Sequence, residues 1–302
     1  MTLLLQVLSN NILPAFIVMG VGFLLDRTLK PHLLTISRLA LYGLSPCLVF
    51  TALVESQLEG GDMLAVVAYA TVVILGMVAI ASLTARLLRL NQATSSAFVL
   101  GSTLVNAGNF GLSVILYAYG ETGLQFAVVF FVASAVISNT VGAFIASRSQ
   151  GNWRQSLRSV LRLPLLYAAI LAVALRLANL VPPRLIMRPL DTIAQAAVPT
   201  MLLLLGMQLS RTRLQHEKKL VLLASAQKLV VMAGLALAVG SLFGLPDVAR
   251  RVCIVEASTP TAVTASVLAT EFDSRPDLIA STIFLSTLAS AFTLTIIISL
   301  LG

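Results

Sequence analysis

The stretch VNAGNFGLSV, residues 105–114, decides how this chain is interpreted. It lies inside a long apolar segment, yet it contains two asparagines, Asn106 and Asn109, and two glycines, Gly108 and Gly111. Glycine costs about 1 kcal/mol relative to alanine in a helix interior, and asparagine competes for backbone hydrogen bonds. The stretch therefore predicts an interruption in an otherwise apolar helix.

The composition is that of a membrane protein. Of 302 residues, 58% are hydrophobic and only 11% are charged, and the mean hydropathy is +0.97. Soluble domains carry about 25% charged residues. Apolar runs long enough to cross a bilayer recur along the chain, so we expect an all-α membrane protein. Ten transmembrane helices are predicted, at 8–25, 36–54, 63–85, 95–119, 124–146, 163–180, 190–209, 219–243, 248–270 and 277–301.

The basic residues predict the orientation of these spans. Fourteen of the twenty Lys and Arg residues lie in or beside the odd-numbered links, and five lie on the other side. By the positive-inside rule, the odd-numbered links are cytoplasmic and both termini face outward. The net charge of +8 is explained in this way, and the basic link 147–162 favours anionic lipid over nucleic acid as a partner.

The second half of the chain repeats the spacing of prolines and irregular stretches found in the first half. A shift of 153 residues places Pro46 on Pro199 and NAGNFGLSV (106–114) on TPTAVTASV (259–267). Two halves of five spans each must have opposite orientations, because five is odd. We therefore expect two inverted repeats of five helices, 1–146 and 163–302, which is the plan of many secondary transporters.

Both irregular stretches fall near the middle of their spans. Proline costs about 3 kcal/mol in a helix interior and leaves a carbonyl without its usual partner. Backbone groups freed in the membrane must be satisfied by protein or by cavity water. Close packing of helices through small residues is the alternative explanation. Two breaks at equivalent depth favour discontinuous helices 4 and 9 that meet at a polar cavity.

Each break would expose the N-terminal end of a half-helix, which is a suitable site for a carboxylate or another anion. The C-terminal ends of the other half-helices could instead hold a cation or a proton-bearing group. The candidate substrate-binding residues are Asn106, Gly108, Asn109, Gly111, Ser258, Thr259, Pro260 and Thr261.

Two ionisable residues lie well inside predicted spans, away from the span ends: Lys228 in span 8 and Glu256 in span 9. An ionisable group in the membrane is a functional hypothesis by default. We expect substrate charge recognition or coupling; the alternatives are a structural salt bridge and, for Glu256, a position at the water-facing rim. Secondary polar lining is predicted at three amides that could also serve only as interhelical hydrogen-bond donors and acceptors: Asn139, Gln208 and Gln227.

An enzyme is not predicted. The two histidines, His32 and His216, lie in cytoplasmic links, and no HExxH, P-loop or GxGxxG motif is present. Cys47 and Cys253 lack metal-type spacing and are expected to be small apolar residues of the core. We therefore expect no catalytic residue, no metal and no cofactor.

With its basic central link, NAGNFG in span 4 and TPT in span 9, the chain resembles the auxin efflux carrier family of membrane transporters. The resemblance implies a fold like that of the bile-acid sodium symporters. A scaffold domain would contain spans 1, 2, 6 and 7, and a transport domain would contain spans 3–5 and 8–10 with crossed helices 4 and 9. It implies substrate at the two motifs and hints at a homodimer. The plant carriers have proline at both crossings, whereas span 4 here has none.

Together, these features predict a secondary transporter that moves a small organic anion through the lipid bilayer of a bacterial inner membrane. The resemblance implies a mono- or dicarboxylate such as malonate or malate, carried by an elevator-type movement. Coupling is expected to be absent or to use protons, with Glu256 as carrier. Two alternatives remain: a sodium-coupled symporter of the bile-acid type and a membrane sensor that binds ligand without transporting it.

Overall fold

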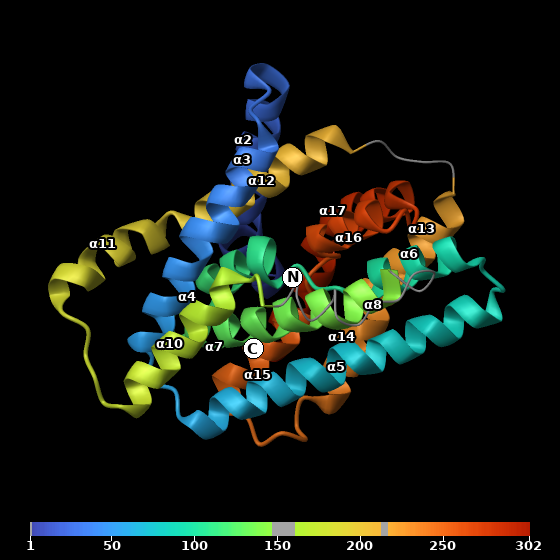
Figure 1. Ribbon diagram of the computed structural model, residues 1–302. Helices are drawn as coiled ribbons and strands as arrows, with labels where there is room; N and C mark the ends of the chain where they lie inside the picture. Colours follow the sequence, from blue (N-terminus) through green and yellow to red (C-terminus); the bar gives the residue numbers. More distant parts are fainter. Residues whose placement is uncertain (1, 147–160, 213–216) are drawn as a thin grey trace.

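The computed structural model describes residues 2–146, 161–212 and 217–302, and this part of the chain is helical, with one isolated β-bridge (Figure 1). Most of the predicted link 147–162, and His216, lie outside the described residues. The elements, with η marking π-helical turns, are α1 Thr2–Val7, η1 Leu8–Ile12, α2 Leu13–Leu29, α3 Leu33–Leu39, η2 Ala40–Leu44, α4 Ser45–Val54, α5 Gly60–Leu87, α6 Gln92–Thr103, η3 Ala107–Gly111, α7 Leu112–Ile137, η4 Ser138–Gly142, α8 Ala143–Ala146, α10 Pro164–Leu177, α11 Arg184–Gln195, α12 Ala197–Arg211, α13 Lys218–Ala226, η5 Gln227–Val231, α14 Met232–Val239, α15 Asp247–Ala257, α16 Val263–Glu271 and α17 Pro276–Leu301.

Seven helical runs of the described chain are long and apolar enough to cross a membrane: Leu3–Leu29, Leu33–Val54, Gly60–Leu87, Ala107–Ala146, Arg184–Arg211, Lys218–Val239 and Pro276–Leu301. The predicted all-helical membrane protein is therefore confirmed. The three predicted spans without a continuous long run are 163–180, which contains the 14-residue α10, and 95–119 and 248–270, which are interrupted. Ten spans in two inverted repeats stay a prediction.

The helices pack in two groups. α2 packs on α12, and α4 packs on α10 and α11, so residues 13–54 and 164–211 lie together. α5 packs on α6, α7 and α15, while α17 packs on α6, α13 and α16, so residues 60–146 and 218–301 form the second group. Figure 1 shows α2 and α3 rising together at the top, with α12 crossing beside them at an angle, while α5 crosses the lower part of the view.

The closest approach in the first group is between α2 and α12. A Cβ atom added to Gly22 of α2 would lie 2.8 Å from the carbonyl carbon of Leu203, and one added to Gly206 of α12 would lie 2.7 Å from that of Met19. Backbone atoms cannot move aside as a flexible side chain can. The pairing therefore depends on glycine at both positions, as in other membrane helix pairs with small residues at the interface.

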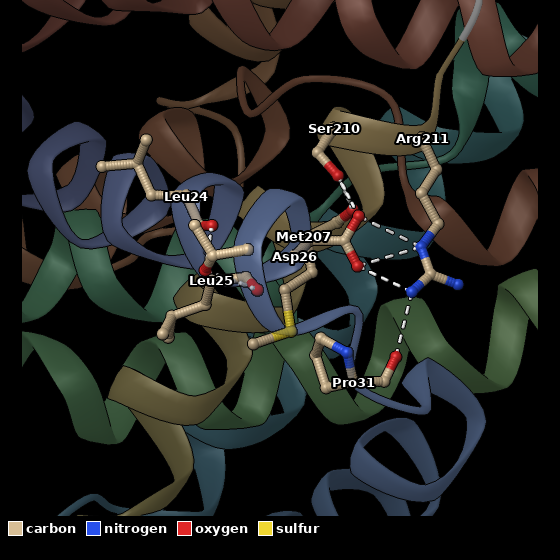
Figure 2. Close-up of polar contacts among 8 residues, drawn as sticks. Leu24, Leu25, Asp26, Pro31, Met207, Ser210 and Arg211 are labelled. Atoms are coloured by element: carbon tan, nitrogen blue, oxygen red, sulfur yellow. Dashed lines mark hydrogen bonds and ion pairs between the residues drawn. The ribbon is translucent and has the colours of Figure 1, made fainter.

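A buried carboxylate joins the ends of the same two helices (Figure 2). Asp26 of α2 accepts a hydrogen bond from the Ser210 hydroxyl. It also forms an ion pair with Arg211, whose Nη2 lies 2.7 Å from the Asp26 Oδ1. The same Nη2 donates to the Pro31 carbonyl at 2.9 Å. Because a buried charge is tolerated only when it is paired and hydrogen-bonded, this cluster fixes α12 against α2 and against the link that follows α2.

Candidate functional site

Two helices are interrupted, and the interruptions cross. One break separates α6 from η3, and the other separates α15 from α16; both are at the places that the sequence predicts. The two extended segments form an antiparallel bridge. The Asn106 N–H donates to the Pro260 carbonyl at 3.0 Å, and the Ala262 N–H donates to the Leu104 carbonyl at 2.9 Å. These bonds satisfy backbone groups that the breaks free from helical pairing.

A cavity of about 310 Å³ lies against this crossing. Its lining includes the first residues of both half-helices that start there, Asn106, Gly108 and Asn109 on one side and Ala262, Val263 and Thr264 on the other. No side chain caps the start of η3 or of α16. Two helix N-termini, each with free N–H groups and partial positive charge, therefore border one cavity.

The NAGNFG residues have different positions relative to this cavity. Asn106 is 3% exposed and lines the cavity, and its Nδ2 has no hydrogen-bond partner. Asn109 is half-buried and also lines it. Gly108 lets the backbone approach Phe131, because a Cβ there would lie 2.6 Å from the ring. Gly111 lies outside the lining.

The STPT residues, Ser258 to Thr261, are buried and none of them lines the cavity. The Thr259 hydroxyl donates to the Glu256 carbonyl, and the Thr261 hydroxyl donates to the Gly101 carbonyl, each at 2.6 Å. Ser258 likewise donates to a carbonyl of its own helix. These side chains therefore satisfy carbonyls at the breaks, and the next three residues, 262–264, border the cavity in their place.

Lys228 and Glu256 are fully buried beside the crossing. The Lys228 Nζ donates to the Ala257 carbonyl at 2.9 Å, at the C-terminal end of α15, where the helix dipole favours a cation. The Glu256 carboxylate packs on Gly111, since a Cβ there would lie 2.7 Å from the carboxyl carbon, and neither oxygen has a hydrogen-bond partner. The two groups interact electrostatically, although no direct ion pair joins them in the described chain. Neither lines the cavity.

Of the three amide side chains predicted as secondary lining, two line the cavity and one does not. Asn139 and Gln208 line the cavity, and the buried Oε1 of Gln208 has no partner. Gln227 does not line it; its Nε2 donates to the Thr84 hydroxyl at 2.6 Å. Gln227 therefore joins α5 to η5 and matches the alternative interpretation as an interhelical hydrogen bond.

Several polar residues of the lining were not predicted from the sequence. They are Ser37, Ser45, Ser134, Ser138, Thr264 and Glu271. Ser134 and Ser138 are four residues apart, so they share a helix face beside Asn139, and this spacing was a usable signal. Glu271 has no comparable signal, because it reads as an acid in a polar link.

A second cavity of about 760 Å³ adjoins the first and shares Gln208, Val263, Val267 and Glu271 with it. Its lining also includes Arg211 and Asp277. Both of these charges are paired, Arg211 with Asp26 and Asp277 with Arg275. Hydrogen bonds to Asp277 and Glu217 raise the pKa of Arg275, so its positive charge stays on this network.

Interrupted helices that cross beside a cavity, in an all-helical membrane protein, define the class of membrane transporters. The family model for membrane transport proteins matches residues 7–156 and 152–298. The chain therefore belongs to this family, that of the auxin efflux carriers, and the predicted family is confirmed.

Two relatives carry transporter names. The chain is 27% identical over 263 residues to an uncharacterized transporter of Methanothermobacter thermautotrophicus, covering 86% of each chain. It is 28% identical over 204 residues to an uncharacterized transporter of Methanocaldococcus jannaschii, covering 66% of each chain.

The described residues contain no group of three or more His, Cys, Asp or Glu side chains that could hold a metal ion.

Proposed function

We propose that this protein is a secondary transporter of a small organic carboxylate across the cytoplasmic membrane. One observation carries the proposal: two uncapped helix N-termini and the unpartnered Nδ2 of Asn106 border the same cavity. Such N-termini bind the anionic groups of substrates in discontinuous-helix transporters. Family membership supports a transporter, and the residues that border the cavity support an anionic substrate.

Several features support ten spans in two inverted repeats. The run Ala107–Ala146 leaves the helical conformation at Gly120, where φ is 63°, between predicted spans 4 and 5. α10 supplies a short sixth span, and the two interrupted helices supply the fourth and ninth. With the odd-numbered links in the cytoplasm, both cavities lie on the cytoplasmic side of the crossing, because Ser37, Leu163 and Phe272 of the first lining adjoin those links.

The two groups of packed helices support an elevator-type movement. Helices of residues 13–54 and 164–211 would form the scaffold, and those of 60–146 and 218–301 would carry the crossing. The first cavity lies between the groups, because Met201 and Gln208 belong to one and Asn106 and Thr264 to the other. A sliding of the second group along the first would carry the guest from the cytoplasmic to the outer side.

Glu256 is our candidate for proton coupling. Its carboxylate packs on Gly111, whose N–H donates at 2.9 Å to the carbonyl of the cavity residue Asn106. A change in the charge of Glu256 can therefore affect the cavity residue Asn106 through the single helical turn that connects Gly111 to it. Its two unpartnered oxygens can accept a proton without breaking a hydrogen bond.

Proton coupling predicts that the rate of carboxylate transport depends on the proton gradient across the membrane. In proteoliposomes, an imposed proton gradient should accelerate carboxylate uptake by the wild type, and a sodium gradient should not. The variant Lys228→Met/Glu256→Gln removes both buried charges together and should transport at a rate that the proton gradient does not change. A wild-type rate insensitive to the proton gradient would contradict the coupling and leave a uniporter.

Asn106→Asp tests the anion site itself. The substitution keeps the size of the side chain but replaces the unpartnered Nδ2 donor with a carboxylate oxygen beside the guest. Because like charges in a buried site cost several kcal/mol, we expect carboxylate affinity to fall about 100-fold or more. Affinity is measured by equilibrium binding to the purified protein, and transport by proteoliposome uptake over a panel of labelled carboxylates.

The matched control is Asn91→Asp, at the start of α6, the half-helix that ends at Thr103, before the break. Asn91 caps this helix by accepting from the Thr94 N–H at 2.9 Å, and aspartate makes the same cap. This variant should bind and transport as the wild type does. Unchanged binding by Asn106→Asp in folded protein would refute an anion site at the crossing.

A further inference from the structure

The cavity contains little charge for an anion to pair with. Among the residues that the structure describes, its lining includes no Lys, Arg or His, and Lys228 is buried behind the crossing with its Nζ on a carbonyl. The positive potential comes from the two uncapped helix N-termini, one at η3 and one at α16. Each helix N-terminus is equivalent to roughly half a unit charge, so the two together offset about one negative charge. A substrate with two carboxylates would bring one negative charge without compensation into a partly enclosed site.

The rest of the lining is mostly apolar. Leucine, valine, alanine, methionine and phenylalanine side chains from both helix groups form the wall, among them Phe131, Met201, Leu204, Val267 and Leu268. Several hydroxyls and amides of the lining already bond to their own helices, such as Ser134 to Phe131 and Asn139 to Ala135. This wall suits a hydrocarbon body better than a second polar group.

Of the described residues that line the first cavity, one is acidic, Glu271, and because its side chain is exposed it marks the mouth of the cavity. Val263, Val267 and Glu271 are spaced four residues apart on α16, so they form one stripe that starts at the crossing and lines both cavities along its length. Glu271 is exposed and forms no ion pair in the described part of the chain. It lies about 12 Å along the helix from Val263. A second carboxylate about 7 Å beyond the first would lie within a Debye length, about 8 Å, of Glu271.

We propose that the cavity selects monocarboxylates with an apolar body, and that Glu271 excludes extended dicarboxylates. The inference rests on the proposed function and narrows it. The two helix N-termini hold one carboxylate at the crossing, the apolar wall holds the hydrocarbon chain, and the acid at the mouth repels a terminal carboxylate.

Hexanoate and adipate provide a matched test, because both have six carbons and differ in one terminal carboxylate. Binding of each to the purified protein is measured by calorimetry, which avoids the passive leak of free fatty acids through vesicles. We expect hexanoate to bind about tenfold or more tighter than adipate. Glu271→Gln should strengthen adipate binding about threefold or more and leave hexanoate unchanged, because the substitution removes only the repulsion at the mouth. The control Glu121→Gln removes an exposed acid that lines neither cavity and should change neither affinity.

The outcomes separate the two proposals. Adipate binding as tightly as hexanoate, or a Glu271→Gln variant with unaltered adipate affinity, overturns the selectivity. In either case Asn106→Asp still weakens both ligands if the anion site is correct. Failure of both ligands to bind the wild type, together with no uptake of any carboxylate of the panel, overturns the proposed function and the selectivity with it.

Discussion

Gly22→Leu should prevent recovery of folded protein. Any Cβ at this position meets the backbone of Leu203, and a leucine adds three more carbons to the same interface. Overpacking by side chains costs about 1–3 kcal/mol, and here the obstacle is backbone, so the two helices must separate. Separation also breaks the cluster of Asp26, Ser210 and Arg211 at the end of the pair and leaves the buried carboxylate unpaired.

Gly20→Leu is the control on the same helix. A Cβ at Gly20 meets nothing within 4 Å, and this position is exposed on the outside of α2. Leucine is also the better helix former, by roughly 1 kcal/mol, so this variant should be at least as stable as the wild type. Both proteins are purified in detergent and compared by monodisperse yield and by the midpoint of thermal unfolding. Equal behaviour of the two variants would show that α2 and α12 do not meet through their backbones.

The two interruptions could be predicted from the sequence because they depend on local chemistry. Asn106 and Gly108 in one span, and Pro260 in another, weaken the helix wherever they occur. The relation of 153 residues between the two stretches also depends only on order along the chain. For these reasons the places of the breaks were predictable before the fold was known.

The direction of the side chains at the breaks was not predictable, because it depends on the crossing. Thr259 and Thr261 were predicted to bind substrate. The Thr259 hydroxyl instead donates to the Glu256 carbonyl three residues earlier, and the Thr261 hydroxyl donates to the Gly101 carbonyl across the crossing. Gly111 reads as a helix breaker, whereas its role in the fold is to make room for the Glu256 carboxylate. The Thr261 hydrogen bond and the contact of Gly111 with Glu256 both join segments far apart in the sequence, which the sequence alone does not bring together.

Lys228→Met should lower stability strongly. It removes the ammonium that interacts with Glu256 and donates to the Ala257 carbonyl, while the glutamate stays fully buried. Removing one partner from a buried pair of charges costs about 3–5 kcal/mol, because the remaining charge has no compensation. The measured quantity is the free energy of unfolding in detergent micelles. Lys219→Met, the same substitution at an exposed position of α13, should change this free energy by about 0.5 kcal/mol or less.

The double variant Lys228→Met/Glu256→Gln decides whether the two charges act together. If the carboxylate is the group left without compensation, removing it as well should recover more than half of the stability lost by Lys228→Met. A double-mutant cycle then gives a coupling of about 1 kcal/mol or more, as expected for buried neighbours. If the losses of the two single variants simply add, the ammonium serves only the Ala257 carbonyl, and Glu256 must already be neutral in the folded protein. That result would still allow Glu256 to carry a proton, but it would remove Lys228 from the coupling.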